Sequence, residues 1–178
     1  MLTHRKCHLM LKKFRKRLFL LVINFVKYIP FTATMKIRNY CYKYVLKNMG
    51  KNCNISDGVT IFTPWNVSIG DRVSINVSCY IGGEGDITIG NFVAIAHNCS
   101  IISETHIFTD TTIPIKEQGT MGQPISIGND VWLGSKVTIL GNVNIGDGAI
   151  IGANSLVTKD IPENVIAVGV PCKVIRFR

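Results

Sequence analysis

Large aliphatic residues recur at every sixth position over residues 127–157, and this period constrains the fold more than any other feature of the sequence. The six positions are Ile127, Leu133, Ile139, Ile145, Ile151 and Val157. Four residues after each of the first five stands a second, mostly smaller residue: Val131, Val137, Val143, Ala149 and Ser155. A period of six matches neither the 3.6-residue repeat of an amphipathic helix nor the alternation of a simple strand. It is typical of a β-helix, whose repeats each supply one short strand and a turn and bury their apolar sides against one another.

The same period occurs earlier in the chain and is interrupted once. The earlier aliphatic positions are Ile69, Ile75, Ile81 and Ile87, and then Ile89, Ile95 and Ile101. The shift of two residues between the two sets predicts an irregular turn near residues 82–86. Residues 103–123 have no repeat and are largely polar. Polar loops of this length inside compact folds are usually functional or disordered, and inserts in repeat proteins gather on one face. We therefore expect the active-site loop at 103–123.

Charge divides the chain into two parts. The sequence has 178 residues with 20 Lys and Arg, and 13 of these precede the first acidic residue, Asp57. The remainder carries 7 basic and 11 acidic residues. We assign residues 1–50 to a basic helical arm and residues 51–178 to the β-helical domain, whose short C-terminal segment is expected to cap the open end of the coil stack. The net charge of +9 therefore does not indicate that the β-helical domain binds nucleic acid.

The arm has the pattern of a basic amphipathic helix. Its apolar residues at helical spacing are Leu11, Phe14, Leu18, Leu21, Val22 and Phe25. Such a helix, over residues 1–33, can lie in the interface of an anionic membrane, or it can pack on the body. The apolar run 18–26 is too short to span a bilayer. Nucleic-acid binding is not expected because the aromatic residues share the apolar face, and a signal peptide is disfavoured by the long charged segment.

A second helix is expected after Pro30, ending near Gly50. Its predicted buried face is Ile37, Tyr40, Cys41, Tyr44 and Val45. The six cysteines include no Cys-x-x-Cys pair, which argues against a zinc ribbon or a disulfide framework. Cys79 and Cys99 occupy the small position of their hexads, so we expect them to be core thiols.

Three segments of the sequence resemble the hexapeptide-repeat acyltransferases. These are residues 127–135, 151–162 and 168–175, and the resemblance covers about residues 55–175. The branch it resembles most is the sugar O-acetyltransferases, which include galactoside, maltose and polysaccharide acetyltransferases. The resemblance implies a left-handed parallel β-helix that assembles as a homotrimer, with acetyl-CoA bound between neighbouring subunits and no metal. The left hand follows from the resemblance alone, because the general rule for parallel crossovers favours the right hand.

Acetyl transfer from a thioester to a hydroxyl requires a base, and imidazole has a suitable pKa. His106, in the loop, matches the position of the catalytic histidine of the family. Asn76 matches an asparagine that helps to place the acceptor and the reacting carbonyl. His97 is expected either to lie on the surface or to line the substrate site. Glu104 and Asp110 are further substrate-site candidates. Either of them, or a backbone carbonyl, could orient His106.

Seven residues are expected to bind the cofactor, acetyl-CoA, by resemblance to the family. They are Trp132, Gly134, Ser135, Ala153, Thr158, Lys159 and Lys173. The small residues would let the pantetheine arm lie against the coils, although corner geometry alone also explains a glycine. The two lysines would pair with phosphates as point charges.

The expected function is acetyl-CoA-dependent O-acetylation of a sugar or glycan acceptor in the synthesis of a bacterial surface polysaccharide, such as O-antigen, lipopolysaccharide, capsule or exopolysaccharide. The expected location is the cytoplasm, with peripheral association at the inner face of the membrane. A xenobiotic (streptogramin-like) or small-sugar acetyltransferase is the alternative, and a catalytically inactive trimeric scaffold is an alternative of another class. A γ-class carbonic anhydrase needs three zinc-bound histidines, whereas residues 51–178 contain only His97 and His106.

Overall fold

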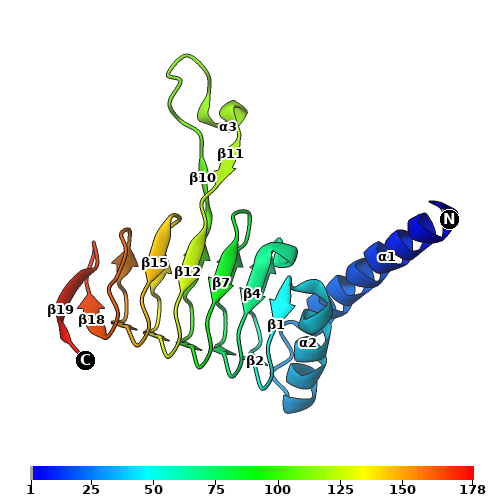
Figure 1. Cartoon of the computed structure of the whole chain (residues 1–178), viewed down its shortest axis with the longest axis horizontal. Helices are drawn as coiled ribbons and strands as arrows, with labels where there is room; N and C mark the ends of the chain where they lie inside the picture. Colours follow the sequence, from blue (N-terminus) through cyan, green and yellow to red (C-terminus); the bar gives the residue numbers. More distant parts are fainter. Residues whose placement is uncertain (1) are drawn as a thin grey trace.

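The computed structural model describes residues 2–178, with side chains from residue 14 onward. Helices α1 (Leu2–Val26) and α2 (Thr32–Val45) precede a stack of short strands. Figure 1 shows α2 at one end of this stack, α1 extending outward from the same end, and the C-terminal strands at the opposite end. The side chain of Leu11, which is part of the predicted apolar face of the arm, lies outside the described side chains.

The strands of the stack form three sheets, here called A, B and C, and β10 and β11 form a separate two-stranded sheet described below. Sheet A contains β1 (Asn48–Met49), β4 (Val67–Ile69), β7 (Ile87–Ile89), β12 (Ile125–Ile127) and β15 (Val143–Ile145). Sheet B contains β2 (Asn54–Ile55), β5 (Ser74–Ile75), β8 (Ala94–Ile95), β13 (Trp132–Leu133), β16 (Ile150–Ile151), β18 (Val165–Val168) and β19 (Lys173–Phe177). Sheet C contains β3 (Thr60–Phe62), β6 (Tyr80–Gly82), β9 (Ser100–Ile102), β14 (Thr138–Ile139) and β17 (Leu156–Val157). The chain visits A, B and C in turn in every coil, and neighbouring coils pair in parallel. The parallel β-helix predicted from the six-residue period is confirmed.

The hexad aliphatics form the core because each lies directly above its equivalent in the next coil. In sheet B, Ile75 is in register with Ile95, Ile95 with Leu133, and Leu133 with Ile151, all at most 1% exposed. The smaller positions are buried in the same way. Cys79 and Cys99 are both 1% exposed and free, so the predicted core thiols are confirmed.

Three edges, AB, BC and CA, join the sheets, and they differ in regularity. Each corner at the AB and BC edges between β1 and β17 is four residues long, and its third residue has a positive φ of 54° to 69°. Left-handed backbone at a residue such as Phe92 is unfavourable, so the stacking of coils must hold these corners. The connections at the CA edge differ in length and conformation from coil to coil. This edge carries the 3₁₀ turn η1 (Pro64–Asn66), the turn at 82–86 and the loop 103–123.

The irregular turn predicted at residues 82–86 follows from coil length. Ile69 is in register with Ile89, twenty residues later, whereas Ile127 is in register with Ile145, eighteen residues later. The longer early coils place their additional residues at the CA edge. This edge is therefore where the coil tolerates inserted chain.

The predicted buried face of α2 is wrong in part. Ile37, Tyr40 and Tyr44 are exposed, and the buried residues are Arg38, Cys41, Tyr42 and Val45. Arg38 is buried because its guanidinium donates to the carbonyl oxygens of Val26 (3.0 Å), Ile29 (3.0 Å) and Ile55 (3.4 Å). The helix ends at Val45, earlier than expected, because the first strand of sheet A begins two residues beyond Leu46.

The C-terminal segment continues sheet B and then reverses. Strand β18 pairs in parallel with β16, and β19 pairs with β18 in antiparallel fashion. The reversed strand covers the open edge of β18, which would otherwise present unpaired backbone groups.

Candidate active site

The loop at 103–123 is an ordered hairpin that leaves the β-helix at the CA edge. Strand β10 (Glu104–His106) pairs in antiparallel fashion with β11 (Thr120–Gly122), with His106 opposite Thr120. Figure 1 shows the hairpin standing out from the row of coils, with the short helix α3 (Ile115–Gln118) near its tip. The side chain of His106 is exposed on this hairpin. The imidazole is therefore accessible to a substrate and is carried by paired backbone.

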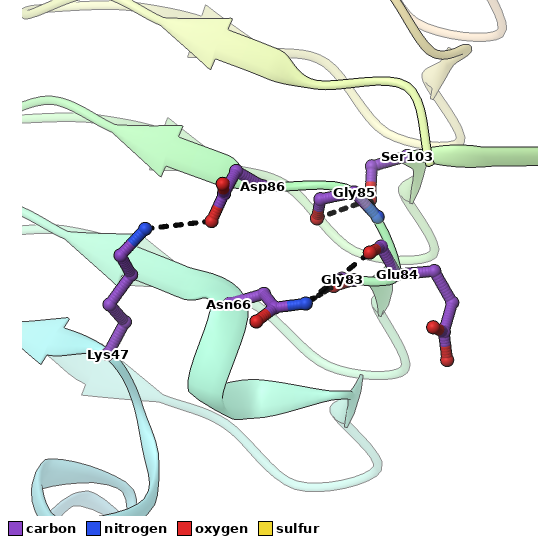
Figure 2. A network of polar contacts seen from close by, with 7 residues as sticks. All are labelled: Lys47, Asn66, Gly83, Glu84, Gly85, Asp86 and Ser103. Atoms are coloured by element: carbon purple, nitrogen blue, oxygen red, sulfur yellow. Dashed lines mark hydrogen bonds and ion pairs between the residues drawn. The ribbon is translucent and has the colours of Figure 1, made fainter. Parts of the chain in front are cut away.

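A buried serine fixes the base of the hairpin. Ser103 is fully buried, and its Oγ contacts the carbonyl oxygens of Gly82 (2.6 Å) and Gly85 (2.9 Å) and accepts from the amide of Gly85 (2.9 Å). The carbonyl oxygen of Ser103 accepts from the amides of Gly85 (3.0 Å) and Gln123 (2.7 Å). Figure 2 shows Ser103 close above Gly85 in the turn of the preceding coil. Both ends of the hairpin are thus bonded at one point, three residues before His106.

The turn at 82–86 is itself tied to the coil before it. Asn66 Nδ2 donates to the carbonyl oxygens of Gly83 (3.0 Å) and Glu84 (3.3 Å). Lys47 Nζ pairs with Asp86 Oδ1 at 2.8 Å (Figure 2). These contacts connect the base of the hairpin to the neighbouring coils. Such support holds a side chain that is carried on an insertion, here His106, in a fixed position.

Acidic side chains gather beside the hairpin base. The pKa of Tyr80 is raised, first by burial and then by the carboxylates of Glu104 and Glu84. Glu84 Oε1 accepts from Thr63 Oγ1 at 2.8 Å. Glu104, predicted for this site, is therefore accompanied by Tyr80, Glu84 and Ser103, which the sequence reasoning missed. The irregular turn at 82–86 was the signal that marked this place.

Asp110 has a local role at the tip of the hairpin. Its Oδ1 accepts from the amide of Thr112 (2.8 Å) and from Thr112 Oγ1 (2.6 Å), an arrangement typical of aspartate in a turn. The hydroxyl and amide of Thr112 lower the pKa of this carboxyl. Gln118 closes the same turn by donating to the carbonyl oxygen of Asp110 at 2.7 Å. The substrate role of Asp110 stays a prediction, and the contacts seen here shape the loop tip.

Asn76 and His97 lie at a different edge from His106. Both are exposed in BC corners, in consecutive coils. Asn76 Nδ2 donates to the carbonyl oxygen of Ile95 at 3.0 Å, so its side chain lies along the corner of the next coil. Within one chain, the predicted catalytic residues therefore lie on two different edges of the three-sided β-helix, His106 at the CA edge and Asn76 at the BC edge.

The residues predicted to bind the cofactor are divided between the same two edges. Trp132 is 54% exposed on sheet B, and Gly134, Ser135 and Ala153 occupy BC corners just beyond it. Lys173 begins β19 in the same sheet. Thr158 and Lys159 are exposed at the CA edge instead, after β17.

Gly134 has a structural requirement of its own. A Cβ atom there would lie 2.6 Å from the amide nitrogen of Ala153 in the next coil. Trp132 presents its ring on the outer face, flanked in register by Ala94 and Ile150. The exposed indole and the small residues at the neighbouring corners offer a surface against which an aromatic base or a pantetheine arm could pack. Among the side chains that the structure describes, no three His, Cys, Asp or Glu groups lie close enough together to bind a metal ion.

Comparison with known proteins assigns the family. The family model "Bacterial transferase hexapeptide (six repeats)" matches residues 124–159. The chain is 39% identical over 140 residues to galactoside O-acetyltransferase of Escherichia coli K12, a match that covers 78% of this chain and 68% of that protein. The chain belongs to the hexapeptide-repeat acetyltransferases. It spans less of two further curated relatives, from Mycobacterium tuberculosis (44%) and Staphylococcus aureus (63%).

Solved structures of this acetyltransferase family have the same architecture. A maltose O-acetyltransferase from Clostridium difficile 630 superposes with a TM-score of 0.81 at 28% identity, over 94% of this chain and 88% of that one. A galactoside acetyltransferase in complex with coenzyme A superposes with a TM-score of 0.80 at 31% identity, over 93% and 82%. This acetyltransferase therefore shares most of its chain with both structures.

Proposed function

We propose that the protein transfers acetyl from acetyl-CoA to a sugar hydroxyl, with His106 as the general base. The observation that carries the proposal is the single exposed histidine on the paired hairpin of an acetyltransferase fold. The matched relatives are named galactoside and maltose O-acetyltransferases, and one matched structure holds coenzyme A. These names support a sugar acceptor and a coenzyme A thioester as the donor.

The chemistry assigns a distinct task to each group. Acetyl-CoA supplies the acetyl group as a thioester. The His106 imidazole takes the proton of the acceptor hydroxyl as its oxygen attacks the thioester carbonyl, because an alcohol is a poor nucleophile until that proton is removed. When the tetrahedral adduct collapses, the C–S bond breaks and the imidazolium returns the proton to the leaving thiolate. The amide of Asn76 would hydrogen-bond to the acceptor or to the reacting oxygen, which carries negative charge at that stage.

The separation of His106 and Asn76 supports a site shared between copies. We propose a homotrimer in which the CA edge of one subunit faces the BC edge of the next, so that each site takes His106 from one chain and Asn76 from its neighbour. Trp132, Ser135 and Ala153 would then lie across the same interface from Thr158 and Lys159. A cyclic trimer closes this heterologous contact without leaving an unpaired edge.

Mixed trimers test the shared site directly. Trimers reassembled at random from equal amounts of His106→Ala and Asn76→Ala chains should regain roughly a quarter of wild-type activity, because one interface in four receives both intact residues. If both residues of each site came from one chain, the mixture would remain as inactive as its components.

His106 itself is tested by substitution. We expect His106→Ala to lower kcat by about 10²- to 10⁴-fold, the usual contribution of a positioned general base, with little change in thermal stability because the side chain is exposed. Lys116→Ala, in α3 of the same hairpin, is the matched control and should keep full activity. Unchanged acetyl transfer by His106→Ala would remove the base assignment.

The acceptor that we propose is a sugar of a bacterial surface polysaccharide, carried on a lipid at the cytoplasmic face of the membrane. Two features support it: the basic apolar helix at the N-terminus and the cytosolic supply of acetyl-CoA that the chemistry requires. A screen with labelled acetyl-CoA should include nucleotide sugars, lipid-linked glycans, free galactosides and maltose, and streptogramins. Preferred labelling of free sugars or streptogramins would contradict this acceptor while leaving acetyl transfer itself intact.

A further inference from the structure

Helix α1 has two apolar faces. One packs against the rest of the described chain, and the other is exposed. On the inner face, Ile23 is 4% exposed and Val26 is 8% exposed, and Phe19 stacks on Tyr44 of α2 with ring centroids 4.9 Å apart. On the outer face, four large side chains have between 49% and 84% of their surface exposed: Phe14, Leu18, Leu21 and Phe25. At 100° per residue these four fall within an arc of roughly 60°. They form a continuous outer stripe that packs on nothing in the described chain.

Aromatic residues continue the exposed apolar surface beyond the end of the helix. Tyr28 is 74% exposed and Phe31 is 68% exposed in the link to α2. Tyrosine is enriched where a protein meets the polar headgroups of a membrane, because its ring is apolar and its hydroxyl is polar.

The charge of the segment identifies what can cover the stripe. Residues 1–31 contain eight Lys and Arg and no Asp or Glu. Arg15 and Arg17 flank the stripe on its two sides in helical projection. A second copy of the same helix would bring two such basic segments together, which is unfavourable. An anionic lipid surface accepts both the apolar stripe and its basic flanks.

We propose that the outer stripe of α1 docks the enzyme on anionic bilayers, with the helix lying in the interface. An apolar stripe exposed along a basic helix is the geometry of a helix that lies on a surface. In the part of the chain that the structure describes, we find no helix with the length and apolar character needed to span a bilayer. The end of α1 is fixed to the body, because Arg38 holds the carbonyls of Val26 and Ile29 and the amide of Gly58 donates to the carbonyl of Lys27 at 2.8 Å. Docking would therefore orient the β-helix on the membrane. The proposal depends on no step of acetyl transfer.

Vesicle co-sedimentation of the full chain tests the proposal. The vesicles are phosphatidylcholine alone or a mixture with phosphatidylglycerol, at low and high salt, without acetyl-CoA or acceptor. We expect binding to the anionic vesicles only, weakened by salt because surface attraction is screened. Arg17→Gln should weaken binding about fivefold, the usual effect of one basic residue near an anionic surface.

The double variant Leu18→Glu with Phe25→Glu should weaken binding by at least about tenfold, because two buried apolar groups are replaced by charges. Phe177→Glu is the matched control, since Phe177 is 77% exposed at the opposite end of the chain. It should bind as the wild type does. An unchanged midpoint of urea denaturation for each variant shows that the body is intact.

Two results would overturn the proposal. One is that the wild-type protein does not bind anionic vesicles, or that the double variant binds them as well as the wild type does. The other is light scattering in the absence of lipid that shows a larger assembly for the wild type than for the double variant, which would assign the stripe to a second copy of the chain. Neither result would affect the assignment of His106.

Discussion

Replacement of Gly85 by alanine should disable the enzyme through the hairpin base, without touching a reacting group. A Cβ atom on Gly85 would lie 2.5 Å from the carbonyl oxygen of Ser103 and 2.7 Å from the amide nitrogen of Gln123. Both neighbours are backbone atoms at the two ends of the hairpin, so no flexible side chain can move aside. The hairpin base would have to shift as a unit.

The required shift can be estimated from the contact distances. Ordinary van der Waals contact begins at 3.4 Å, so the Ser103 carbonyl must move about 0.9 Å from the new methyl group. His106 stands on the strand that begins next to Ser103. Displacements of about 1 Å at a catalytic group cost about 10²-fold in rate, and the overpacking itself costs about 1–3 kcal/mol of stability. We therefore expect kcat to fall about a hundredfold while the protein stays folded.

The matched control has the same clash at another edge. In Gly90→Ala the new Cβ would lie 2.6 Å from the carbonyl oxygen of Gly128 in the next coil, at the AB edge. Both variants should lose similar stability in urea denaturation, but steady-state acetyl transfer should show the large kcat loss only for Gly85→Ala. Equal kcat values for the two variants would refute the idea that this turn positions His106.

Three further predictions concern stability. Arg38→Met should lower the free energy of unfolding by about 3 kcal/mol, because buried carbonyls lose a charged donor, and trypsin should then cleave after Lys27 more rapidly. Ile95→Ala should cost about 2–5 kcal/mol in urea denaturation, since this side chain is fully buried between adjacent coils. Asp110, whose pKa is lowered by Thr112, should titrate by carboxyl NMR below its ordinary value of about 3.9. The ionised carboxylate contributes to loop order at pH values above its ordinary pKa, and this contribution disappears as the pH falls through the lowered pKa. Asp110→Ala should therefore increase proteolytic cleavage of the hairpin at pH 7 but change it little under strongly acidic conditions.

The β-helix was predictable because its period records burial directly. Every sixth residue from Ile127 to Val157 is at most 2% exposed, so a single physical requirement is repeated along the sequence. The shift between Ile87 and Ile89 likewise revealed the longer turn at 82–86. The face of α2 was less predictable, because two neighbours cover that helix and Arg38 is buried by carbonyls that are distant in sequence. The expectation of a left-handed coil came from family resemblance and not from any residue pattern.

The sequence predicted a site residue only where the residue type itself indicates the chemistry. His106 could be named because it is a histidine, a suitable general base, in the segment that interrupts the repeat. The supporting contacts of Ser103, Tyr80 and Glu84 could not be named, because they depend on which coil lies beside the hairpin. The separation of Asn76 from His106 also depends on three-dimensional register, since a spacing of thirty residues does not say which edge of the prism each residue occupies.

The unequal edges also determine how such a protein can be remodelled. Corners at the AB and BC edges are held at four residues by a left-handed backbone position, so an inserted residue there would shift every later side chain out of the core. The CA edge already accommodates a 3₁₀ turn, a longer turn and an entire hairpin without disturbing the stack. New segments for other acceptors should therefore be grafted at this edge, for instance at residues 140–142, where the remaining coils would serve as an unchanged scaffold.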